Sequence, residues 1–363
     1  RLYSEEDFIA RPAFTTPEIL RTSLADVILR MKSLGLGDVE DFPFIEPPGT
    51  RIIEDGYRHL FELGAVDDNK RLTALGWKIA KFPVDAAIAR MLIAADREGA
   101  LPEVLIIAAA LSVQDPRNRP HDKKLEAALA HEKFVHPQSE FLSLVKLWAF
   151  YEEASKHKKS HRKLDQMLRE QFLSPLRMRE WRDVHAQLTE VCASAGMQVA
   201  VDDKIGTAPA SQRAHSAAAA PRSASLGYLP RHAGHALFPE MGERVVTQGA
   251  GNRNHPLPQV TQVSNGELSV RCENIHRALL TGLIVNVGVK SPVGDHYIGT
   301  RSIKFQLPRP SQQHAAQKSA RMKWVMAFEL TETTRVYART VASIEPEWIE
   351  QIGGHLVTRA YFE

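Results

Sequence analysis

Carboxylates, histidines and cysteines build most catalytic and metal sites, and none of them has the spacing of such a site in this sequence. Adjacent carboxylates occur at Glu152–Glu153 and Asp202–Asp203, where polar surroundings favour a solvated surface over general acid–base catalysis. Cys192 and Cys272 lack the spacing of metal ligands, so we expect reduced thiols rather than a disulfide framework. Four irregularly spaced histidines are expected to be solvated, and no metal site is expected: His215, His232, His235 and His255.

Short motifs that mark common catalytic folds are also absent from the sequence. It has no G-x-x-x-x-G-K-[ST] phosphate loop, no dinucleotide-binding G-x-G-x-x-G, no H-E-x-x-H, no G-x-S-x-G and no EF-hand loop. The net charge of +3 and the pI near 8.8 permit nucleic-acid binding without requiring it. Composition alone therefore indicates a multidomain protein that is able to bind nucleic acid.

The sequence shows no sign of membrane insertion or export. The longest apolar run, AIARMLIAA, is too short for a membrane span and is interrupted by Arg90. No basic-then-apolar leader follows Arg1, so we expect a cytoplasmic protein without membrane contact. A start at Arg1 instead of Met indicates a fragment, or numbering that begins within a longer protein.

Three short helices are predicted in the first ninety residues. The first begins with Thr16 as its cap and Pro17 at its first position, and it ends at Gly35. The second is IIEDGYRHLFELGAV, and the third lies in NKRLTALGWKIAKFP after a turn with strand-like content. This pattern is typical of a winged helix, which either binds nucleic acid or serves as a packing platform. The residues favour neither alternative.

The stretch LTALGWKIAKFPVD predicts a corner between two helices. Leu75, Ile79 and Phe82 recur at helical spacing, Pro83 ends that helix, and Asp85 is placed to cap the next one. From there to about residue 195 the chain reads as a helical bundle. Its segment PEVLIIAAALSV is apolar on all sides and predicts a buried central helix. In SPLRMREWRDVHAQLTEV, apolar residues face the core, and three arginines point elsewhere: Arg177, Arg179 and Arg182.

The segment after the bundle changes character. It is rich in Ala, Ser, Pro, Gly and His and lacks apolar periodicity, so it predicts a flexible linker. A helix, CENIHRALLTGLIVNVG, follows it. The remaining sequence predicts strands in HYIGTRSIKFQL, KWVMAFELTETTRVYARTVASI and HLVTRAYFE. A small β-barrel of the OB type, a frequent nucleic-acid binder, is the expected arrangement.

Several stretches, read in order, resemble one protein family. They include RLYSEEDFIARPAFTTPEILRTSLADVILRMKSLGLGDVEDFPFIEPP, ELGAVDDNKRLTALGWKIAKFPVDAAIARMLIAA, FLSPLRMREWRDVHAQL and KWVMAFELTETTRVYARTVASIEPEW. The chain resembles the C-terminal half of a DEAH-box ATP-dependent RNA helicase, most like the bacterial HrpA type. The likeness covers residues 1–195 and 271–363, and it favours the bacterial branch over the eukaryotic splicing helicases.

The resemblance implies a multidomain α+β fold and assigns each segment of the chain to a domain. The implied segments are residues 1–15 as the tail of the second RecA-like motor domain, 16–82 as a winged helix, 83–198 as a ratchet-like helical domain, 199–270 as a low-complexity linker and 271–363 as the OB-fold. The family's Walker A loop, D-E-A-H box and arginine motif would lie before Arg1. ATP and Mg²⁺ would therefore bind outside this chain, which needs no cofactor of its own and is expected to be inactive alone.

In this family, single-stranded RNA passes between the motor domains and the ratchet-like and OB domains. The resemblance implies RNA contacts at basic and aromatic residues, because cations bind phosphates and rings stack on bases. The candidates are Arg301, Lys304, Lys323, Arg335, Tyr337 and Arg339 in the strand segments, and Arg117 and Arg119 in the loop QDPRNRP. For each cation the alternative is a solvated or salt-bridged surface charge.

Two functions remain open at this stage. The first is an accessory region that guides single-stranded RNA for RecA-like motor domains of the same protein. The alternative is a stand-alone RNA- or protein-interaction module without ATPase activity. A Walker A loop and D-E-A-H box in frame before Arg1 would favour the first, and a start codon there would favour the second.

Overall fold

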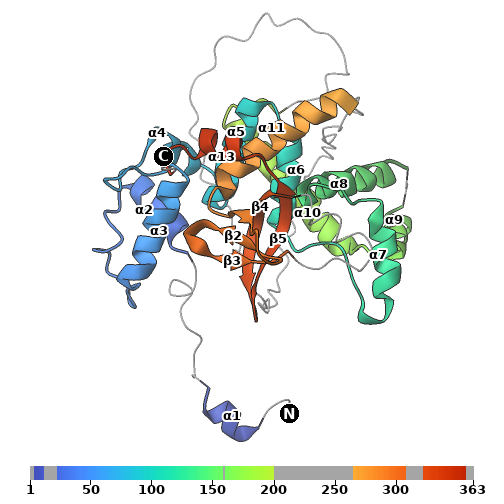
Figure 1. Ribbon diagram of the computed structural model, residues 1–363, viewed down its shortest axis with the longest axis horizontal. Coiled ribbons are helices and arrows are strands. Elements are labelled where there is room, and N and C mark those ends of the chain that lie inside the picture. Colours follow the sequence, from blue (N-terminus) through green and yellow to red (C-terminus); the bar gives the residue numbers. More distant parts are fainter. Residues whose placement is uncertain (1–3, 12–22, 158–159, 200–264, 308–321, 357–363) are drawn as a thin grey trace, which may run out of the picture. The chain divides into compact units, whose positions relative to one another are not determined.

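A computed structural model describes residues 4–11, 23–157, 160–199, 265–307 and 322–356 of the chain (Figure 1). The chain divides into two compact units, one of residues 1–90 and 355–363 and one of residues 91–354. Most of the predicted linker at 199–270, the start of the helix predicted from Thr16 and most of the strand predicted at 355–363 lie outside the described residues. Among the described residues, no helix has the length and apolar character needed to cross a membrane.

The first unit contains the three predicted helices and a small wing. After the short helix α1 (Glu5–Ile9), the helices are α2 (Ala25–Leu34), α3 (Thr50–Glu62) and α4 (Ala74–Ile79). An antiparallel bridge between Val66 and Leu72 forms the wing. The helices pack through buried apolar side chains, which include Leu24, Ile28, Met31, Ile53, Leu60 and Ile79. The winged-helix prediction is therefore confirmed.

Helix α4 is held tightly against the wing. Thr73 caps it by accepting a hydrogen bond from the Gly76 amide (2.9 Å), while its hydroxyl donates to the Gly64 carbonyl (2.7 Å). A Cβ atom added at Gly76 would lie 2.0 Å from the Ala65 carbonyl oxygen, so only glycine fits there. These contacts fix which face of α4 points outward.

The predicted corner after α4 is confirmed in detail. The Asp85 carboxylate accepts a hydrogen bond from the Ala87 amide (2.8 Å) at the start of α5 (Ala86–Glu98). Asp26, on α2, accepts one from the Ala86 amide (3.0 Å). Arg30, one turn further along α2, donates to two carbonyl oxygens of the corner at 3.0 and 3.1 Å. Helix α2 therefore sets the angle at which α5 begins.

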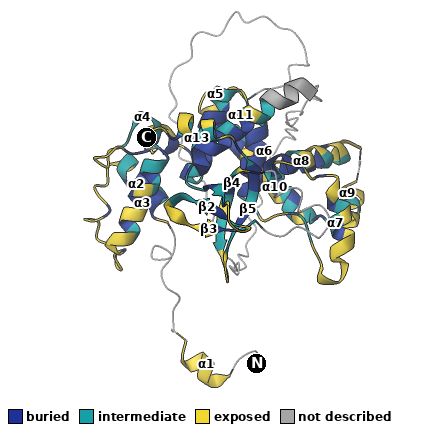
Figure 2. Cartoon of the chain, viewed as in Figure 1, coloured by how far each residue is buried: buried dark blue, intermediate teal, exposed yellow. Residues whose placement is uncertain are grey.

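The second unit begins within α5 and contains a bundle around a buried central helix. Its helices are α6 (Leu101–Leu111), η2 (His121–Lys123), α7 (Lys124–Glu132), α8 (Glu140–His157), α9 (His161–Glu170) and α10 (Pro175–Ser194). Helix α6 is dark blue along its length in Figure 2, and α8 and α10 pack against it. The Trp181 indole on α10 donates to the Ile106 carbonyl (2.9 Å), and its ring lies 5.1 Å from that of Trp148.

An antiparallel sheet completes this unit. Its strands are β1 (Val287–Lys290), β2 (Tyr297–Gly299), β3 (Lys304–Phe305), β4 (Trp324–Glu332) and β5 (Val336–Ser343), in the order β3-β2-β1-β4-β5. Gln306 forms a parallel bridge to Tyr337, so the two edge strands meet. The sheet is therefore curled into the predicted OB-type half-barrel. Its core contains Tyr297, Phe305, Met322, Val325, Ala327, Ala338 and Val341.

Two boundaries and one helix in this region differ from the sequence predictions. Helix α11 (Asn265–Leu283) begins before the predicted linker ends, and it stops before the apolar run that was predicted to continue it. Residues 284–286 of that run form a turn, and its end belongs to strand β1, which pairs with β2 and β4. A short helix, α13 (Pro346–Ile352), was not predicted.

Helix α8 and the sheet are joined directly. The Glu140 carboxylate at the start of α8 accepts a hydrogen bond from the Val341 amide of β5 (3.0 Å). His276 of α11 lies with Nε2 2.8 Å from the Ser139 hydroxyl, which also accepts from the Leu142 amide. The ratchet-like helices and the half-barrel therefore form one packed body within this unit.

Candidate nucleic-acid interface

Three of the predicted RNA-contacting residues lie at or just before the start of β5. Side chains alternate along a strand, so Tyr337 and Arg339 share the outward face of β5 while Ala338 points into the core. Arg335 lies in the bend that directly precedes the strand. Both arginines are exposed, and the tyrosine is half-buried. Two of the predicted residues, Tyr337 and Arg339, thus share one face of β5.

The closure of the sheet adds two residues to this surface. Gln306 pairs with Tyr337, and its amide oxygen lies 3.4 Å from Arg335 Nη1. Lys304, two residues earlier on β3, is exposed on the same side, since Phe305 between them is fully buried. We call the surface made of Lys304, Gln306, Arg335, Tyr337 and Arg339 the seam face. Gln306 was not predicted, because no sequence signal indicates that β3 meets β5.

An acidic residue sits within the same part of the sheet. Glu329 of β4 lies directly opposite Arg339 of β5, and both side chains are exposed. Opposite charges at paired positions attract, so Glu329 offsets part of the positive charge of the seam face. The short turn between β4 and β5 would have allowed the pairing of Glu329 with Arg339 to be predicted from the sequence, but Glu329 was not predicted.

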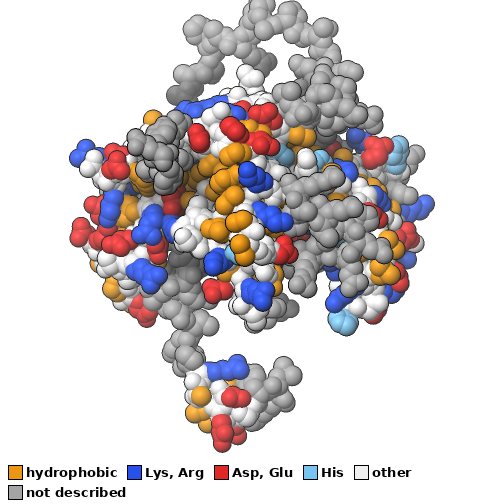
Figure 3. Space-filling model, viewed as in Figure 1, with side chains coloured by type: hydrophobic (Ala, Val, Ile, Leu, Met, Phe, Trp, Pro, Cys, Tyr) orange, Lys and Arg blue, Asp and Glu red, His pale blue; other side chains and the backbone are white. Residues whose placement is uncertain are grey.

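Two further predicted residues lie on the sheet outside the seam face. Arg301 lies at the tip of the β2–β3 hairpin, where its backbone has a φ of 57°. Lys323 directly precedes β4, and its carbonyl accepts a hydrogen bond from the Lys290 amide (2.8 Å). Both side chains are exposed. On the face shown in Figure 3, basic and acidic side chains are interspersed, so local clusters matter more than a continuous field.

Arg117 of the loop QDPRNRP is engaged within the protein. Its guanidinium forms a two-pronged contact with the Asp115 carboxylate, at 2.9 Å from Nε to Oδ1 and 2.7 Å from Nη2 to Oδ2. Burial alone would raise the pKa of Asp115, but the hydrogen bonds and charge of Arg117 outweigh it and hold this pKa below its ordinary value. The geometry therefore gives Arg117 a structural contact in this loop.

The rest of this loop is fixed by the start of α10. Arg177 donates to the Asp115 carbonyl (2.9 Å) and contacts the Asn118 side chain (3.4 Å). The Asn118 amide in turn donates to the Phe172 carbonyl (2.8 Å). Arg119, the second predicted residue of the loop, is exposed. The fixed backbone presents Arg119 outward while Arg117 is held at its carboxylate.

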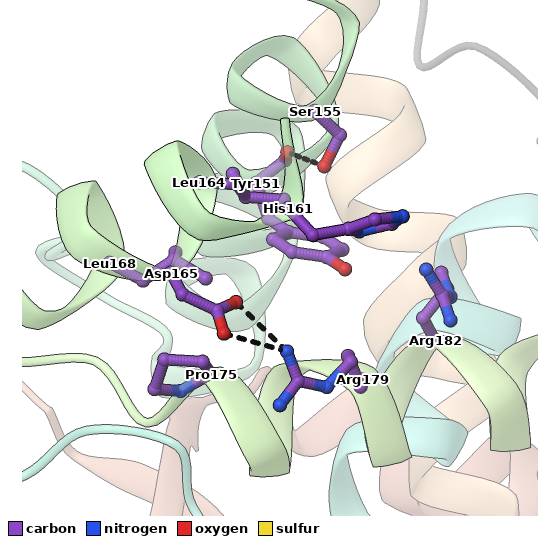
Figure 4. A pocket seen from close by; sticks show the side chains of 9 residues that line it. All are labelled: Tyr151, Ser155, His161, Leu164, Asp165, Leu168, Pro175, Arg179 and Arg182. Atoms are coloured by element: carbon purple, nitrogen blue, oxygen red, sulfur yellow. Dashed lines mark hydrogen bonds and ion pairs between the residues drawn. The ribbon is translucent and has the colours of Figure 1, made fainter. Parts of the chain in front are cut away.

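The remaining two arginines of α10 line a hollow between α8, α9 and α10 (Figure 4). Arg179 Nη1 contacts both carboxylate oxygens of Asp165, at 2.8 and 3.1 Å. Arg182 pairs with Asp183 (3.0 Å). Burial would lower the pKa of Arg182, and Asp183 and Tyr151 together raise it instead. Arg177 and Arg179 therefore hold α10 to the loop at Asp115 and to α9.

Among the described residues, no group of three or more His, Cys, Asp or Glu side chains is placed to hold a metal ion. The deeply buried histidines lie in packed cores rather than in an open site. His185 packs 4.7 Å from the Trp148 ring, and burial lowers its pKa to about 4. Burial likewise raises the pKa of the Cys192 thiol to about 12.

Three family models match successive parts of the chain. A helicase-associated winged-helix domain matches residues 57–84, a ratchet-like helicase-associated domain matches residues 85–175, and an OB-fold domain matches residues 275–356. Over all of its length the chain is 36% identical to the ATP-dependent RNA helicase HrpA of Escherichia coli (strain K12). The chain therefore carries the winged-helix, ratchet-like and OB domains associated with helicases, and it is similar over its whole length to one portion of HrpA-type RNA helicases. Its bundle corresponds to the ratchet-like domain and its half-barrel to the OB domain.

Two other relatives indicate whether the chain is more similar to the bacterial HrpA proteins or to a splicing helicase. The HrpA homologue of Haemophilus influenzae is 35% identical over 99% of the chain. The pre-mRNA-splicing factor ATP-dependent RNA helicase prp22 of Schizosaccharomyces pombe is 25% identical over 97% of it. The higher identity to the HrpA proteins agrees with the predicted bacterial type. The chain spans 23% of the length of each HrpA relative and 24% of prp22.

Proposed function

We propose that this chain is the accessory region of an ATP-dependent RNA helicase and that it guides single-stranded RNA during ATP-driven unwinding. The observation that carries the proposal is the seam face, where the edges of the sheet meet and bring exposed Lys304, Arg335 and Arg339 to the same part of the surface as half-buried Tyr337. A groove that holds single strands combines these two features, because cations follow the backbone and rings stack on bases. The contact between Glu140 and Val341 would transmit motion of the ratchet-like helices to this surface.

The proposed partners are RecA-like motor domains of the same protein, acting in the cytoplasm. These domains would hold ATP and Mg²⁺ and carry out hydrolysis. Phosphoryl transfer requires a phosphate cradle, an acid that holds the metal and an arginine that stabilises developing charge. The sequence has no motif for the first of these, so the purified chain is expected to show no RNA-stimulated phosphate release.

Binding of labelled oligouridine to the full chain, followed by fluorescence anisotropy at about 50 and 200 mM salt, tests this proposal. Phosphate contacts from Lys304, Arg335 and Arg339 predict a slope of log K on log salt near −2, at about −0.7 per contact, and thus about 16-fold weaker binding at the higher salt. Affinity that is unchanged by salt would contradict the proposal.

A matched pair of variants assigns the binding to the seam face. Replacing Arg335 and Arg339 by Gln is expected to weaken binding about tenfold and to flatten the salt dependence. Replacing Arg162 and Arg169 by Gln removes the same charge from exposed positions on α9 and serves as the control. Equal losses in both variants would show that net charge, and not this surface, holds the RNA.

A further inference from the structure

The single tryptophan that is largely exposed lies far in sequence from the seam face, on the winged helix. The five tryptophans are all in described residues, and Trp148 and Trp181 are fully buried while Trp324 and Trp348 are partly buried. Trp77 on α4 is 50% exposed. An indole is among the largest apolar side chains, and leaving it in water forgoes much of the stabilisation that burial would bring.

The exposure of Trp77 cannot be relieved by rotating α4. Gly76 faces the wing so closely that the helix has no alternative register, and Thr73 holds the first turn. Arg30 holds the backbone that follows the helix. The indole is thus presented outward on a fixed helix.

Two lysines lie close to the indole along the chain. Lys78 follows Trp77 directly on α4, and Lys81 lies in the turn after the helix, where its amide donates to the Lys78 carbonyl (3.2 Å). Both are exposed, and neither forms an ion pair with another described residue. Ala74, one turn before Trp77, is also exposed and leaves the approach to the ring open. We call Ala74, Trp77, Lys78 and Lys81 the α4 face.

We propose that the α4 face is a second binding site for single-stranded RNA, in which one base stacks on Trp77 and the neighbouring phosphates contact Lys78 and Lys81. The ring offers the π-surface that any base accepts, and the two ammonium groups complement phosphates. A protein partner is disfavoured because lysine is depleted in the cores of protein–protein interfaces. The inference rests on the proposed function for its ligand, but it uses residues of the other unit.

The intrinsic fluorescence of the full chain provides a readout specific to this site. Titration with oligouridine of about 12 nucleotides is expected to quench the emission, because stacking on a base quenches an exposed indole. Trp77→Phe should abolish most of the quenching while binding weakens only a few-fold, since a smaller ring remains. Trp77→Ala should weaken binding about tenfold. Lys81→Gln should reduce the salt slope by about 0.7.

Controls separate this site from the seam face and from misfolding. Ile45→Ala removes a fully exposed apolar side chain from the same unit and should change neither quenching nor affinity. Unaltered thermal unfolding of Trp77→Ala would show that the winged helix is intact in this variant. If Trp77→Ala unfolds at a lower temperature, the loss of quenching in Trp77→Phe tests the site instead. In the Arg335→Gln, Arg339→Gln variant the quenching should persist at higher RNA concentration.

Each outcome decides the inference. If Trp77→Ala and Lys81→Gln bind RNA like the wild type while the seam-face variant binds more weakly, the α4 face is not an RNA site and the proposed function stands. If the wild-type chain binds no RNA, both proposals fail. If Trp77→Ala keeps its RNA affinity but loses binding to separately purified motor domains, the face docks protein and the inference is overturned.

Discussion

Acidification should weaken the second unit through His276, which lies where α11 meets α8. Its Nε2 is 2.8 Å from the Ser139 hydroxyl, and its Nδ1 is 2.6 Å from the Cys272 carbonyl. The Cys272 carbonyl can only accept a hydrogen bond, so the neutral ring carries its proton on Nδ1, and its Nε2 accepts from the Ser139 hydroxyl. Burial, together with the nearby charge of His136, lowers the pKa of His276 from 6.5 to about 4.

The sign and size of the effect follow from this pKa. Between pH 6.5 and 4 the unfolded chain binds the proton and the folded chain does not, so stability falls as the pH is lowered through this range. At 1.36 kcal/mol per pH unit, His276 accounts for about 2 kcal/mol between pH 6.5 and pH 5. His185, whose pKa is also about 4, contributes in the same direction. Glu103 and Glu152 act oppositely, because burial raises their carboxyl pKa values.

Urea unfolding at about pH 7.5 and 5 measures the contribution of His276 by difference. In His276→Gln, whose amide can still donate to the Cys272 carbonyl, the loss on acidification should be about 2 kcal/mol smaller than in the wild type. His161→Gln replaces an exposed histidine of α9 and serves as the control. If His276→Gln and the wild type lose the same free energy of unfolding, the reasoning from the buried neutral ring is wrong.

Three further predictions concern single substitutions. Gly76→Ala places a methyl group against a carbonyl oxygen of the wing and should destabilise the first unit by about 1–3 kcal/mol in urea unfolding, and an unchanged midpoint would contradict the close packing. Arg117→Ala should lower the thermal midpoint with little change in RNA affinity, because its guanidinium is held by Asp115. Arg119→Ala should weaken RNA binding and leave the thermal midpoint unchanged, because its side chain is exposed. Equal losses of RNA affinity in the two variants would refute this distinction. Glu329→Gln removes the acid opposite Arg339 and should strengthen oligouridine binding two- to threefold, about 0.5 kcal/mol, while weaker binding would show that Glu329 orders the arginine.

Much of the helical architecture is predictable because its signals are local. Helix α6 is apolar on every side, and Pro83 and Asp85 predict the corner before α5. The end of α11 was mispredicted because apolar residues continue past Leu283 toward β1, with only Asn286 between them. Strand pairing with β2 and β4, which local sequence does not reveal, ends the helix at Leu283.

The candidate site was only partly predictable, for a similar reason. Strand alternation alone places Tyr337 and Arg339 on one face of β5. The addition of Gln306 depends on the meeting of two strands at the sheet's edges. The contact of Arg117 depends on a loop shape fixed by Arg177, distant in sequence. Contacts between residues distant in sequence decide which cations remain exposed for binding a ligand. Residue types alone do not reveal these contacts.

Photo-crosslinking tests the central claim most directly. The full chain would be irradiated with oligouridine that carries a photoreactive uridine, and the crosslinked tryptic peptides would be identified by mass spectrometry. The account predicts a crosslink to the peptide of residues 336–339, which contains Tyr337, and its loss in Tyr337→Ser. RNA crosslinked only to peptides of α9 and α10, with none from the seam face, would contradict the account.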